Sequence, residues 1–65
     1  MSDLAKIRKK AGWSRDRAAV EARVAYATCR LFEASPEAVQ DLEARGRLEA
    51  VYQQLRAIAE GERAA

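Results

Sequence analysis

The 65-residue chain contains no histidine and only one cysteine, Cys29. Without histidine, it lacks the side chain that most often performs general acid–base catalysis at neutral pH, and Cys29 has no histidine to activate it as a nucleophile. A single cysteine also excludes an intramolecular disulfide and a cysteine-rich zinc site. We therefore expect Cys29 to be a small buried core residue, and we expect a protein that is not an enzyme and holds no metal or cofactor.

Long apolar runs and glycine-rich loops are missing too. No apolar stretch approaches the ~20 residues that span a bilayer, and no glycine-rich loop could cradle a phosphate group. The acidic residues Asp16, Glu21, Glu33 and Glu37 do not have metal-ligand spacing. The single cysteine and the absence of a signal-peptide pattern predict a cytoplasmic protein without a membrane partner.

Charge is distributed unevenly along the chain. Residues 1–30 carry eight basic and three acidic side chains, whereas residues 31–65 carry four basic and seven acidic ones. A basic half and an acidic half are typical of a protein that binds a polyanion with one side. On charge alone, an uneven solvated surface explains the pattern equally well.

The chain also has a single proline, Pro36, and no alternation of β-branched and polar residues that would predict strands. Apolar residues at steps of three and four predict an all-α fold. We expect one domain over residues 1–65, a compact bundle of four to five short helices containing a helix-turn-helix. The predicted helices span residues 3–11, 15–22, 25–34, 36–45 and 47–60.

Capping and breaking residues set these boundaries. Gly12 is expected to end the first helix, and Ser14 to cap the second, with Trp13 packing over its first turn. Pro36, which follows a serine, predicts the start of the fourth helix. Gly46 is expected to separate the last two helices because the apolar stripe changes phase there, although a glycine inside one continuous helix costs only about 1 kcal/mol. The last predicted helix stops before a third glycine at position 61.

Residues 13–35 carry a recognisable pattern. A small residue lies in the middle of one predicted helix, apolar residues flank the following turn, and the next helix has apolar anchors followed by a glutamate. These residues are Ala19, Ala22, Val24, Cys29, Phe32 and Glu33. Together with residues 7–12 ahead of it, the segment resembles the helix-turn-helix of the Xre or lambda-repressor-like family, over about residues 4–45. Two helices that cross steeply need a small residue at their contact, and the second can then enter the major groove.

The segment departs from the family pattern at two positions. Arg23 stands in the turn where glycine is usual, and a positive φ at a residue other than glycine costs about 1 kcal/mol. Ala18 stands where leucine is usual, which thins the core. The link to the fourth predicted helix is also shorter than in the family.

The resemblance implies that the protein binds double-stranded DNA. It places Tyr26, Ala27, Arg30 and Leu31 at base-reading positions, and Arg15, Arg23 and Thr28 at phosphate-contacting positions. Arginine pairs with guanine O6 and N7, and small apolar groups contact the thymine methyl. Phosphate contacts fix the register without reading sequence. The resemblance further implies a structural ion pair between Arg8 and Glu33.

The last predicted helix carries the most regular apolar stripe. Its residues are Leu48, Val51, Tyr52, Leu55 and Ile58. The stripe has two interpretations, because it can close the core within one chain or form the seam of a dimer. We favour a role in a homodimer, since symmetric dimers are common and bind two half-sites about one DNA turn apart.

The predicted function is a sequence-specific, repressor-like transcriptional regulator of phage, plasmid or bacterial type that binds double-stranded DNA as a dimer. The alternative is a small helical protein-interaction module on the same fold, which would bind a protein partner such as a toxin or a polymerase subunit through Tyr26, Leu31 and the C-terminal apolar stripe. A third hypothesis, a sequence-indifferent DNA binder, is disfavoured by the net charge of only +2.

Overall fold

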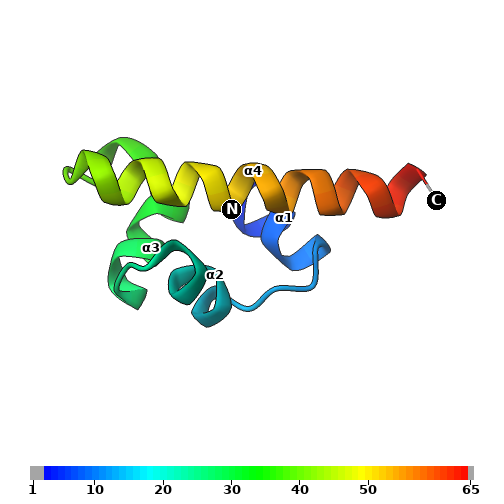
Figure 1. The fold of residues 1–65 in the computed structure, drawn as a ribbon, viewed down its shortest axis with the longest axis horizontal. Helices are drawn as coiled ribbons and strands as arrows, with labels where there is room; N and C mark the ends of the chain where they lie inside the picture. The colour runs from blue at the N-terminus through cyan, green and yellow to red at the C-terminus, as the bar shows by residue number, and fades with distance from the viewer. Residues whose placement is uncertain (1–2, 65) are drawn as a thin grey trace.

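Four α-helices and one turn of 3₁₀-helix make up the computed structural model, which describes the backbone of residues 3–64 and the side chains of residues 3–61 (Figure 1). The helices are α1 (Asp3–Lys10), α2 (Arg15–Ala22), α3 (Tyr26–Ala34) and α4 (Leu42–Ala64), and the 3₁₀ turn η1 spans Pro36–Ala38. Residues 3–64 contain no strand. The predicted all-α fold is therefore confirmed.

Helix α4 is the rod against which the other helices pack. At a rise of ~1.5 Å per residue it is roughly 34 Å long, and the longest dimension of the molecule is 37 Å. Helices α1, α2 and α3 lie along one side of α4, whose C-terminal end extends beyond them (Figure 1). Both α1 and α2 contact α4, and α2 packs on α3. None of the described helices is both long enough and apolar enough to span a membrane.

The boundary between α1 and α2 follows the sequence prediction. Gly12 has a φ of 83° and ends α1, and the Trp13 N–H donates back to the Arg8 carbonyl at 3.1 Å. This hydrogen bond is the Schellman arrangement, which favours glycine at the left-handed position. Ser14 caps α2, because its Oγ accepts a hydrogen bond from the Arg17 N–H at 3.1 Å.

The turn between α2 and α3 depends on a left-handed arginine. Arg23 has a φ of 58° and a ψ of 45°. The N–H groups of Arg23 and Val24 donate to the carbonyls of Val20 and Ala19, again in the Schellman arrangement. Arg23 thus has a positive φ at the position where the family has glycine. This conformation costs about 1 kcal/mol at a residue that has a Cβ.

Arg47 ties α4 to this turn. Its Nε donates to the carbonyl of Ala22 at 2.9 Å, and its Nη2 donates to the carbonyl of Arg23 at 3.4 Å. Carbonyls at the end of a helix have no partner within the helix, and a positive charge there is favourable. The guanidinium of Arg47 therefore stabilises the turn from outside the helix pair, a role that sequence reasoning did not assign.

Small residues allow α2 to approach its neighbours closely. The side chains of Ala18, Ala19 and Ala22 are all buried, so the alanine at position 18 is accommodated by close helix packing. The apolar core consists of Trp13, Ala18, Ala19, Ala22, Cys29, Phe32, Val39, Ala44, Leu48, Val51, Tyr52 and Leu55.

The apolar stripe of α4 closes this core within one chain. Leu48 and Leu55 are completely buried, Val51 and Tyr52 are less than a tenth exposed, and Ile58 is half-buried. The intramolecular interpretation of the stripe therefore accounts for the first four residues. A dimer seam through them would require the core to open, so a homodimer of this fold needs another surface.

The predictions of separate helices over 36–45 and 47–60 are wrong. Residues 36–38 form only a 3₁₀ turn, and α4 runs without a break from Leu42 through Gly46 and past Gly61. The cap of α4 is Asp41, whose Oδ1 accepts hydrogen bonds from the backbone N–H groups of residues 43 and 44. Pro36 does start a helical turn, as expected, but the turn does not continue into α4.

The phase change that suggested two helices came from Leu42. This side chain is 71% exposed, while Ala44 is buried. With Ala44 as the first inward residue, the step to Leu48 is four and the stripe continues at helical spacing through Gly46. One continuous helix therefore buries the whole stripe.

We expect Gly46→Ala to stabilise the protein by about 0.5–1 kcal/mol, because glycine lowers the stability of a helix interior. Gly46 is exposed, and nothing lies within 4 Å of the position of an added Cβ. Urea denaturation followed by circular dichroism measures the change.

The matched control is Gly12→Ala. Gly12 also has open space around it, but its φ is +83°, so this substitution should destabilise the protein by about 1 kcal/mol. A Gly46→Ala variant less stable than the wild type would contradict a continuous α4.

Candidate nucleic-acid interface

The four residues predicted to read bases lie on the exposed side of α3. Tyr26 and Leu31 expose 45% and 44% of their surface, and Ala27 and Arg30 are exposed as well. We refer to these four residues as the α3 face. The apolar anchors of the same helix, Cys29 and Phe32, are buried. The inner and outer sides of α3 are therefore the ones that the sequence predicted.

The three candidate phosphate-contacting residues differ in accessibility. Arg23, in the turn before α3, is exposed, and Thr28 is half-buried. The side chain of Arg15 is 30% exposed. Its Nε donates to Glu33 Oε1 at 3.0 Å, and its Nη1 donates to the Tyr26 hydroxyl at 3.1 Å. The structure thus joins Arg15 and Tyr26, which the sequence had placed in separate roles.

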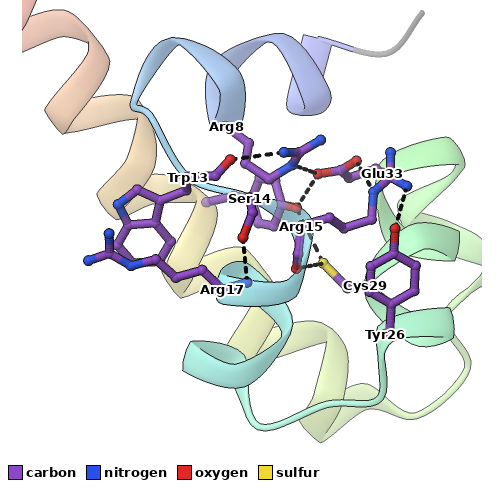
Figure 2. A network of polar contacts seen from close by, with 9 residues as sticks. Arg8, Trp13, Ser14, Arg15, Arg17, Tyr26, Cys29 and Glu33 are labelled. Carbon is purple, nitrogen blue, oxygen red and sulfur yellow. Dashed lines mark hydrogen bonds and ion pairs between the residues drawn. The ribbon is translucent and has the colours of Figure 1, made fainter.

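Helix α3 also carries a buried carboxylate, Glu33, toward which the side chains of Arg8 and Arg15 are directed (Figure 2). Arg8 Nε donates to Glu33 Oε2 at 2.6 Å, and Arg15 bonds to the other oxygen. The Tyr52 hydroxyl also donates to Oε2. Arg8 and Glu33 are 5% and 4% exposed. The ion pair that the family resemblance implied between these two residues is therefore present.

These contacts connect all four α-helices. Arg8 comes from α1, Arg15 from α2, Glu33 from α3 and Tyr52 from α4. Arg8 Nη1 also donates to the Trp13 carbonyl at 2.9 Å, which holds the link between α1 and α2. Among the described side chains, every buried nitrogen and oxygen has a hydrogen-bond partner. This matters because a buried charge is costly unless it is paired and hydrogen-bonded.

Hydrogen bonds keep Glu33 ionised despite its burial. Burial opposes ionisation, but the hydrogen bonds from Arg8, Tyr52 and Arg15 outweigh it, and the pKa of Glu33 lies below its ordinary value. The carboxylate therefore remains an acceptor for all three donors at neutral pH.

Tyr52 has a polar role that sequence reasoning missed. Besides its bond to Glu33, its hydroxyl lies 3.4 Å from Cys29 Sγ, and its ring packs against Phe32 with centroids 5.2 Å apart. Burial, together with the contacts to Cys29 and Glu33, raises the pKa of Tyr52 above its ordinary range. The signal in the sequence was a tyrosine on a stripe of aliphatic residues, because a buried tyrosine hydroxyl usually needs a partner.

The lone thiol is enclosed by the core. Cys29 is completely buried, as the sequence predicted, and burial raises the pKa of its thiol. Among the described side chains, no group of three or more cysteine, aspartate or glutamate residues could hold a metal ion.

Trp13 packs over the start of α2, as predicted. It is 8% exposed, and the guanidinium of Arg17 lies 4.0 Å from the centroid of its ring (Figure 2). This contact is a cation–π interaction at the surface. It joins the side chain of Arg17, in the first turn of α2, to the residue that precedes the cap of the helix.

Two grooves that run along α4 do not include the α3 face. Both grooves include Arg56. One is bordered by α1 residues such as Lys6 and Lys10, and the other by Leu4 and Phe32. Both grooves therefore lie apart from the four exposed residues of the α3 face.

Comparison of the chain with protein-family models, with curated proteins and with solved structures found no match.

We expect the free energy of unfolding to fall as the pH drops below about 4.5. The pKa of Glu33 is lower in the folded state than its ordinary value of 4.5, so its stabilising contribution is complete above that value and is lost as the pH falls through the folded-state pKa. Urea denaturation at several pH values between 3 and 7 measures the effect.

Glu33→Gln should remove this acid-sensitive contribution. At neutral pH we expect the variant to be less stable by about 3 kcal/mol, because Arg8 then lacks its buried counter-charge. Glu49→Gln, at an exposed position of α4, is the control and should keep the wild-type pH profile. An unchanged profile in Glu33→Gln would show that other groups cause the acid sensitivity.

Proposed function

We propose that the protein binds double-stranded DNA by inserting the α3 face into the major groove, and that it acts as a sequence-specific, repressor-like regulator. The observation that carries this proposal is the exposed helix α3, with α2 packed behind it through small residues. The major groove is about 12 Å wide and admits one α-helix. The resemblance of residues 13–35 to Xre or lambda-repressor-like proteins supports the same function.

In this proposal, Arg30 reads a base directly. It is exposed, and no described acidic side chain forms an ion pair with it. A free guanidinium on a groove-facing helix can form two hydrogen bonds to guanine O6 and N7. Ala27 and Leu31, beside it on the α3 face, are suited to contact the methyl group of thymine.

Two arginines supply phosphate contacts near the start of α3. Arg23 lies in the preceding turn, and Arg15 is hydrogen-bonded to Tyr26, the first residue of α3. Positive groups beside the N-terminal end of a groove-reading helix hold it in register on the sugar–phosphate backbone. Thr28, which is half-buried on α3, is a third phosphate candidate.

A homodimer that occupies two half-sites is the form of the protein we propose for operator binding. Since the stripe of α4 is buried in the core, the contact between the two subunits has to use other apolar side chains that are exposed. Val20 and Leu42 are 73% and 71% exposed. They lie on neighbouring segments, because Arg47 of α4 bonds to the C-terminal carbonyl of α2.

One observation favours a second function. Tyr26 and Leu31 are large apolar residues that remain nearly half exposed, and such residues also suit a protein–protein interface. A protein-interaction module would use the same α3 face without reading DNA. Selection of duplexes from a random DNA library separates the two functions, because only the DNA-binding function enriches a sequence.

For the enriched duplex, we expect Arg30→Ala to lower the affinity by about 5- to 150-fold, equivalent to about 1–3 kcal/mol, and to relax the preference at one base pair. Affinities for the duplex and for its single-base-pair variants measure both effects. Arg56→Ala removes the same charge from an exposed position of α4 and should leave affinity and preference nearly unchanged. Equal losses on all sequences would contradict base reading by Arg30.

The variant Arg23→Gly tests a phosphate contact, as Arg30→Ala tests a base contact. It removes the guanidinium, and glycine suits the left-handed turn, so the fold should gain up to about 1 kcal/mol. Affinity should fall by a similar factor on all sequences. The plot of log affinity against log salt concentration has a negative slope, and the magnitude of this slope should decrease by about one. A sequence-dependent loss would contradict a phosphate contact by Arg23.

A further inference from the structure

A chain of hydrogen bonds runs from α4 to the exposed end of α3. The Tyr52 hydroxyl donates to Glu33 Oε2, and Glu33 Oε1 accepts from Arg15 Nε at 3.0 Å. Arg15 Nη1 then donates to the Tyr26 hydroxyl at 3.1 Å. The buried Tyr52 and the exposed Tyr26 are therefore connected through two side chains.

We propose that Tyr52 is a positioning residue for the α3 face, because it orients Glu33, which holds Arg15, which in turn fixes the hydroxyl of Tyr26. The consequence for DNA rests on the proposed function. The positioning of Arg15 by Tyr52 does not rest on it and can be tested without DNA.

Tyr52 is needed to orient the carboxylate of Glu33. The terminal torsion of a glutamate side chain is broad and has no sharp preferred angle. Arg8 holds Oε2 through Nε, while its Nη1 is directed to the Trp13 carbonyl. A second donor on Oε2 restricts the rotation that one donor allows. Without the Tyr52 hydroxyl, Arg8 alone holds Oε2, so the position of Oε1 is less restricted and its hydrogen bond from Arg15 Nε is weakened.

Arg15 determines which hydrogen bond Tyr26 can offer to a ligand. Because Arg15 has only donors, the oxygen of Tyr26 accepts from it. The hydroxyl proton of Tyr26 is then free to be donated outward. Tyr26 therefore presents a donor on the α3 face, which suits an acceptor such as a phosphate oxygen, guanine O6 or thymine O4.

The first test follows the Nε–H proton of Arg15 by NMR. In Tyr52→Phe, the ring that packs on Phe32 is kept and only the hydroxyl is lost. We expect exchange of the Arg15 Nε–H with water to accelerate by about tenfold or more, because a hydrogen bond to a charged group is lost or weakened. The signal of Arg17, which lies over Trp13, is the internal control. Unchanged exchange at Arg15 would overturn the proposal.

The matched control for stability is Val51→Ala. Val51 is the neighbour of Tyr52 on α4 and is buried, but it takes no part in the hydrogen-bond chain. At a temperature where circular dichroism shows every variant to be folded, this substitution should leave the exchange of Arg15 unchanged. Accelerated exchange in Val51→Ala as well would mean that loosening of the core, and not the hydroxyl of Tyr52, controls Arg15.

The second test compares Tyr26→Phe, Tyr52→Phe and the double variant on the enriched duplex. Both single variants should reduce the affinity for the enriched duplex by about 3- to 10-fold, the range of a single hydrogen bond. The affinity of the double variant should be no lower than that of Tyr26→Phe alone, because the two substitutions remove the same hydrogen bond to the duplex. Additive losses would overturn the positioning role. If the wild type enriches no duplex, the proposed function fails, and the exchange of Arg15 still decides the role of Tyr52.

Discussion

The ion pair between Arg8 and the buried carboxylate of Glu33 is the interaction on which the arrangement of the helices depends. A carboxylate that is 4% exposed must be surrounded by donors. Its donors are Arg8, Arg15 and Tyr52, which belong to three different helices. Satisfying one charge therefore positions three helices around α3. The apolar core alone is less directional, since many of its side chains are alanines.

The same interaction links the interior of the protein to its candidate interface. Helix α3 carries Glu33 on its inner side and the α3 face on its outer side, within nine residues. Arg15 bridges the two sides, because it bonds to both Glu33 and Tyr26. The residues that stabilise α3 are thus also the residues that orient its exposed end. In the proposed function, the geometry of the DNA-binding interface therefore depends on how the core is packed.

Local signals were sufficient to predict the first three helices, whereas the C-terminal half and the side-chain network needed the structure. Gly12 and Ser14 mark their boundaries by backbone conformation and capping, which depend on few neighbours. The phase of α4 was misjudged because sequence spacing does not show whether Leu42 or Ala44 faces inward. Tyr52 was treated as an apolar residue because its partner Glu33 is 19 residues away. The predicted base-reading residues share one exposed face, but their contact with DNA remains a prediction.

The most direct test of the account is an NMR titration of the ¹⁵N-labelled protein with the duplex enriched from a random library. We predict that the largest changes in chemical shift fall on Arg23 and on the α3 face, with smaller changes along α4. The signal of the Arg15 Nε–H should persist, because Glu33 continues to hold it in the complex. Changes confined to α1 or α4, or no change at duplex concentrations far above that of the protein, would contradict the claim that the α3 face binds DNA.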